Sequence, residues 1–115
     1  MSQGFCTAYT PAPVKLSELR AKTDRQLQGL VHSRIDVGLE FAVLAEVEAS
    51  SGDRGYAERS LERADQALAE VETLLPVLNE GHRRSLHPKL TELREAVHRL
   101  ARNNKRARSN AASAF

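Results

Sequence analysis

Leucine and alanine recur every three or four positions over most of the chain, and this period constrains the fold more than any other feature. Between residues 57 and 78 the steps alternate between four and three without a break, at Ala57, Leu61, Ala64, Leu68, Val71, Leu75 and Leu78. The same steps occur at Leu86, Leu90, Leu93, Val97 and Leu100. This spacing places apolar side chains on one face of an α-helix. It therefore predicts two long amphipathic helices.

An earlier stretch of the chain has a looser helical spacing. Its apolar or small residues are Leu27, Leu30, Val31, Ile35, Gly38, Ala42, Ala45 and Ala49. Thr23, followed three positions later by Gln26, is typical of a capping box at a helix start. We expect this helix to run to about Ser50, where Ser51-Gly52-Asp53 provides a stop and a new cap. A short separate turn of helix is expected at 15–22.

Two prolines predict the remaining boundaries. Pro76 should kink or end the second helix, because proline offers no amide hydrogen and collides with the preceding turn. The third helix should begin between His82 and Pro88, with Pro88 in its first turn. The apolar pattern ends after Ala101.

Three long helices joined by short breaks predict an all-α fold, an antiparallel three-helix up-down-up bundle with flexible N- and C-terminal tails. Aromatic residues make up only 4% of the 115 residues and tryptophan is absent, which favours helices over sheets. We expect a flexible N-terminal arm at 1–14, a bundle domain at 15–104 and a disordered basic tail rich in small residues at 105–115.

The cysteine content and hydropathy predict a cytoplasmic protein. Cys6 is a single cysteine and has no partner for an internal disulfide, as is usual in a reducing compartment. The first fifteen residues lack the basic start and apolar stretch of a secretory signal. No segment approaches the ~18 apolar residues of a transmembrane helix, so no membrane partner is expected.

The segment Val37–Val47 is apolar around most of a helix. Leu39, Val43 and Val47 fall on the side opposite Ala42 and Ala45. Such a second apolar stripe favours a partner-binding surface, either for self-association as a homodimer or for a partner helix. The alternative is that the N-terminal turn or the region after the second helix covers this stripe.

Two resemblances bear on the fold. One rests on Gly52-Asp53, Tyr56, Ala57, Leu61, Ala64, Leu68 and Pro76, which resemble a single hairpin of a tetratricopeptide repeat. This resemblance implies a scaffold that binds peptides or proteins without catalysis. The other rests on Leu19-Arg20, Lys22-Thr23-Asp24-Arg25, the alanine-rich helix and Leu75-Pro76, which are similar to short uncharacterised bacterial helical proteins. It implies a fold and no activity.

The sequence contains no pattern that predicts catalysis. Glu95 and His98 have the Glu-x-x-His spacing of di-iron bundles, but that pattern must occur twice and here it occurs once. His82 and His87 are five positions apart, which does not place two imidazoles on one helical face. We therefore expect no enzyme activity, no catalytic or metal-binding residue, and no cofactor.

Charge is distributed unevenly along the chain and suggests a second function. Residues 36–80 carry three basic and eleven acidic groups, whereas residues 81–115 carry nine basic and two acidic groups. The alternative is therefore an electrostatic nucleic-acid-binding protein, which would use Arg99, Arg102, Lys105, Arg106 and Arg108. The main prediction is a non-catalytic helical protein-interaction module.

Overall fold

The structure, a computed structural model, describes residues 13–113 and is helical throughout this range apart from two short connections. It contains α2 (Pro13–Ser50), α3 (Arg54–Leu74), a 3₁₀ turn η1 (Leu75–Val77) and α4 (Glu80–Ser113). The described range contains no strand. The all-helical fold with three long helices is therefore confirmed.

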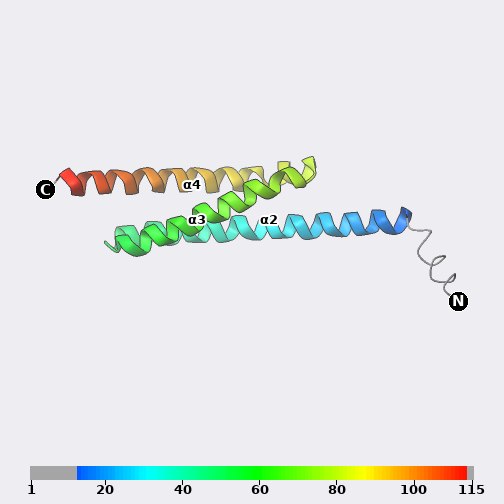
Figure 1. Cartoon of the computed structure of the whole chain (residues 1–115), viewed down its shortest axis with the longest axis horizontal. Helices are drawn as coiled ribbons and strands as arrows, with labels where there is room; N and C mark the ends of the chain where they lie inside the picture. The colour runs from blue at the N-terminus through cyan, green and yellow to red at the C-terminus, as the bar shows by residue number, and fades with distance from the viewer. Residues whose placement is uncertain (1–12, 114–115) are drawn as a thin grey trace.

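The three helices form an elongated molecule of 81 × 29 × 19 Å. Figure 1 shows α3 returning along the C-terminal half of α2, and α4 then running in the direction of α2. The N-terminal part of α2 and the C-terminal part of α4 extend past α3 at opposite ends of the molecule (Figure 1). Only the central part of the molecule is therefore three helices thick.

The connections between the helices follow from turn-forming residues. Gly52 has φ +85, which an L side chain rarely adopts, and Asp53 caps α3 by accepting a hydrogen bond from the Tyr56 amide at 3.4 Å. The expected stop and cap at 51–53 are confirmed. Helix α3 ends at Leu74 and Pro76 lies in η1, which confirms that proline ends the second helix.

The expected start of the first helix is wrong. Thr23 lies inside α2, which is continuous from Pro13 to Ser50, and residues 15–22 form no separate turn. The residues before Thr23 include Leu16, Glu18, Leu19, Arg20, Ala21 and Lys22, all good helix formers. Their helix propensity outweighs the capping signal at Thr23. The predicted N-terminal arm lies outside the described residues, except for 13–14, which are helical.

The expected limits of the third helix are also wrong. Helix α4 begins at Glu80, where the Asn79 side chain accepts a hydrogen bond from the His82 amide at 2.8 Å. Pro88 therefore lies inside the helix, where it cannot donate to the carbonyl of Arg84. At the other end α4 continues to Ser113, so residues 105–113 are helical where we expected a disordered tail. Residues 114–115 lie outside the described range.

The core lies along the seam between the three helices. Ile35, Leu93, Val31 and Val71 are its largest fully buried side chains. Gly38 lies at a close contact between helices: a Cβ atom added there would be 3.0 Å from both Leu93 methyl carbons and 3.2 Å from the Ala67 Cβ. A side chain at position 38 would therefore require Leu93 or Ala67 to shift, and glycine lets α2 pack closely against the other two helices.

Candidate interaction surfaces

The three residues predicted as a partner-binding surface are not equivalent in the structure. Val43 and Val47 are exposed, at 61% and 56% of their full accessibility. Leu39 is partly buried and packs against the core. Leu44, which the sequence analysis did not single out, is 45% exposed and lies one turn before Val47. We call Val43, Leu44 and Val47 the outer strip of α2.

The sequence around the outer strip is acidic. Between residues 35 and 50 of α2 there is no lysine or arginine, and the acidic residues are Asp36, Glu40, Glu46 and Glu48. Three of them have partners: Asp36 pairs with Lys89, Glu46 pairs with Arg99, and the Glu48 Oε1 atom accepts a 2.6 Å hydrogen bond from the buried Ser60 hydroxyl. Glu40 is exposed, with no bonding partner within residues 13–113. The outer strip is thus an apolar patch with a negative border.

The basic residues predicted to bind nucleic acid fall into two groups. Arg99 pairs with Glu46 on α2 at 3.3 Å, and Arg108 pairs with Glu58 on α3 at 2.9 Å. These two side chains connect α4 to its neighbours. Arg102, Lys105 and Arg106 are exposed and form no ion pair within the described residues. Of the five basic residues predicted to bind nucleic acid, these three face water without an acidic partner among residues 13–113.

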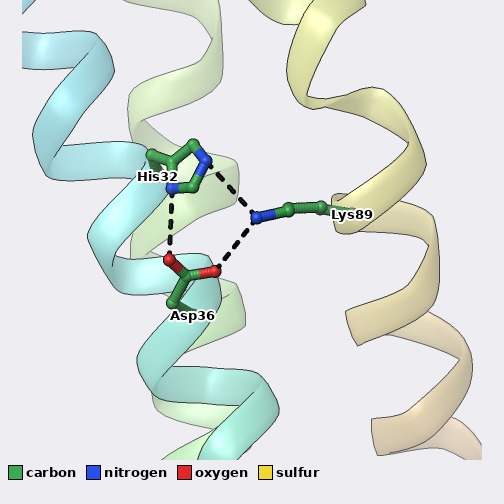
Figure 2. A network of polar contacts seen from close by, with 3 residues as sticks. All are labelled: His32, Asp36 and Lys89. Carbon is green, nitrogen blue, oxygen red and sulfur yellow. Dashed lines mark hydrogen bonds and ion pairs between the residues drawn. The ribbon is translucent and has the colours of Figure 1, made fainter.

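A polar network joins α2 to α4 near the middle of the molecule (Figure 2). The His32 Nδ1 atom lies 3.2 Å from Asp36 Oδ2, and the Lys89 Nζ atom lies 3.4 Å from His32 Nε2 and 3.5 Å from Asp36 Oδ1. An imidazole with its hydrogen on Nδ1 satisfies both of the His32 contacts, because it donates to the carboxylate and accepts from the ammonium group.

These three side chains are 45–47% exposed, so water solvates the network. A general base needs a substrate held within hydrogen-bond reach, and here the Nε2 atom that would act as the base already contacts Lys89. Exposed pairs of this kind contribute about 0–1 kcal/mol to stability. The geometry fits a surface contact that fixes the position of α4 on α2.

The other histidines are dispersed along α4. His87 Nε2 is 3.5 Å from the Thr91 hydroxyl, one turn away on the same helix. The Nδ1 atom of His82 is shielded from water and has no hydrogen-bond partner in the described chain. Glu95 and His98 are both exposed. In the part of the chain that the structure describes, no three His, Cys, Asp or Glu side chains are grouped so that they could hold a metal ion. Cys6 lies outside that part.

A groove of about 340 Å³ lies where the end of α2 and the start of α3 meet the C-terminal half of α4. Its apolar lining is mostly alanine: Ala45, Ala49, Ala57 and Ala107, with Leu61 and Leu100. Small side chains leave this end of the seam incompletely filled. Arg54 reaches across it and donates to the Ala107 carbonyl at 3.4 Å.

Comparison of the chain with protein-family models, curated proteins and solved structures found no match. The resemblances to a tetratricopeptide hairpin and to bacterial helical proteins therefore stay predictions. None of the described helices combines the length and the apolar character needed to cross a membrane.

Proposed function

We propose that this protein is a non-catalytic interaction module, an up-down-up helical bundle that binds another helix on the outer strip of α2. The observation that supports the proposal is the exposure of Val43, Leu44 and Val47 on successive turns of a helix whose opposite face is already buried. Residues spaced in this way form the docking face for an amphipathic helix. Apolar side chains grouped together on a surface are also typical of interaction sites.

The negative border favours one kind of occupant. A helix with leucines on one face and lysine or arginine beside them would complement both the apolar strip and the carboxylate of Glu40. The competing occupant is a second copy of this chain, docked through the same strip. It would bring two acidic borders together, which costs binding energy.

The test uses a synthetic amphipathic peptide with a leucine face flanked by lysines, and measures its binding to the full chain by fluorescence anisotropy. We expect the double substitution Val43→Glu and Val47→Glu to weaken binding by about tenfold or more, because each carboxylate would be buried against leucine. Val77→Glu is the matched control, since Val77 is equally exposed but lies in η1. Failure of the unchanged protein to bind at ~100 µM peptide rejects the proposal.

A second candidate function is electrostatic binding of nucleic acid. It is supported by the exposure of Arg102, Lys105 and Arg106 on α4 without acidic partners among residues 13–113. Replacing all three by glutamine should reduce the salt dependence of duplex binding by about two to three phosphate contacts, whereas Arg99→Gln should change it less because Arg99 pairs with Glu46. Absence of binding to duplex or single-stranded nucleic acid at about 50 mM salt rejects this function.

A further inference from the structure

The N-terminal part of α2 carries an apolar stripe that the bundle leaves largely uncovered. Leu16, Leu19 and Leu30 are 57%, 52% and 45% exposed, whereas Leu27 is partly buried against the core. The stripe therefore begins at the end of the core and continues along the part of α2 that projects past α3 (Figure 1). At 100° per residue, a sector of the helix about 80° wide contains all five positions of the stripe: Leu16, Leu19, Thr23, Leu27 and Leu30.

The spacing of this stripe is symmetric. Its steps are three, four, four and three, so the sequence positions read the same in both directions from Thr23. A two-fold interface must be self-complementary: if one residue contacts a second, the second contacts the first on the other copy. We propose that residues 16–30 of α2 pair antiparallel with the same residues of a second copy, with the two-fold axis at Thr23.

In this arrangement each leucine faces another leucine. Leu16 lies opposite Leu30 of the second copy, Leu19 lies opposite Leu27, and the two Thr23 side chains meet at the axis. The pairing covers the N-terminal leucines and extends the apolar seam past the end of each bundle. This interface is separate from the outer strip of α2, so it does not depend on the proposed function.

The charges beside the stripe fit the same register. Arg20 and Asp24 lie on one flank of the stripe, one helical turn apart. In an antiparallel pair related by a two-fold axis, each flank faces the same flank of the other copy. Arg20 therefore comes next to Asp24 of the second copy, and Asp24 next to its Arg20. The other flank carries Lys22 and Gln26, whose long side chains reach water.

Disulfide trapping tests the position of the axis. The full chain is prepared with Cys6→Ser and Thr23→Cys, and oxidised at about 100 µM, a concentration that populates a dimer with a Kd of ~10 µM. We expect a disulfide-linked dimer within minutes, since two cysteines at the axis are in contact. The matched control is Cys6→Ser with Arg25→Cys, because Arg25 points to the opposite side of α2. Equal rates for the two variants, or no cross-link at residue 23, overturn the proposal.

A second measurement separates this interface from the other possible cover for the leucines, the chain's own residues 1–12. Sedimentation equilibrium of the full chain should give a dimer, with the Kd raised about tenfold or more by Leu19→Glu. Asp24→Arg should also weaken the dimer, and adding Arg20→Asp should restore it. Val43→Glu should leave the mass unchanged, which distinguishes this interface from the outer strip. A monomer at about 200 µM, or no rescue by the charge exchange, rejects the antiparallel pair.

Discussion

Replacing Leu93 by alanine is expected to lower the free energy of unfolding by about 3–5 kcal/mol. Leu93 is fully buried on α4 and lies directly against Gly38 of α2. Removing its branched end leaves a cavity beside Gly38 in the core, and the destabilisation grows with the volume that the neighbouring side chains fail to fill. Urea unfolding followed by circular dichroism measures the change.

The control is Leu44→Ala, which removes the same atoms from an exposed position. Its effect should stay within about 0.5 kcal/mol, because the side chain already contacts water and alanine is a good helix former. A loss below about 1 kcal/mol for Leu93→Ala would contradict the packing described here, because the site would then have to be loose or hydrated.

The periodicity of the sequence predicted the helices and most of the core for a simple physical reason. A helix that packs against neighbours must have apolar residues at steps of three and four, and each member of the stripe from Leu86 to Leu100 is buried. Two exceptions are on α2: Leu30 and Ala49 were expected to face inward and are exposed. Leu30 precedes the fully buried Val31 but lies beside the buried face of the helix, and Ala49 lies at the C-terminal end of α2. A local pattern does not show how wide the buried face is or where a neighbouring helix stops.

Helix limits were harder to predict because local signals compete. Thr23 has the chemistry of a cap, but a cap forms only where the preceding residues leave the helix, and those residues favour it. Pro88 was expected in the first turn, but Asn79 caps α4 nine residues earlier, so the helix begins at Glu80 and contains the proline. Residues 105–113 lack an apolar stripe, yet Arg108 contacts Glu58 across the seam.

Contacts between residues distant in the sequence determine which surface residues are exposed and which are paired. Leu39 and Val43 are one turn apart on α2, but only the placement of the other helices makes the first partly buried and the second exposed. Likewise Arg99 and Arg102 have similar sequence surroundings, and what separates them is the position of Glu46. The sequence indicates which residues could form an interaction surface, and the packing of the helices determines which of them are exposed.

Replacing Gly38 by valine is expected to lower the free energy of unfolding by about 2–3 kcal/mol. Its Cβ would lie 3.0 Å from two methyl carbons of the fully buried Leu93 and 3.2 Å from the Ala67 Cβ, and the two further methyl groups add to this crowding. Gly29→Val on the same helix is the matched control, because nothing lies within 4 Å of a Cβ at that position. That variant should change stability by less than about 0.5 kcal/mol, since valine and glycine differ little in helix propensity.

The cause of the Gly38 effect can be isolated with the Leu93→Ala background. If the valine destabilises by colliding with Leu93, shortening Leu93 provides the space it needs, and the valine methyl groups then fill part of the cavity. We therefore expect Gly38→Val to cost less than about 1 kcal/mol in the Leu93→Ala protein, a coupling of at least ~1 kcal/mol between the two sites. An equal cost in both backgrounds would mean that the valine does not act through Leu93, and that Gly38 does not set the distance between α2 and α4; the Ala67 Cβ on α3, 3.2 Å from the added Cβ, would then be the neighbour to test.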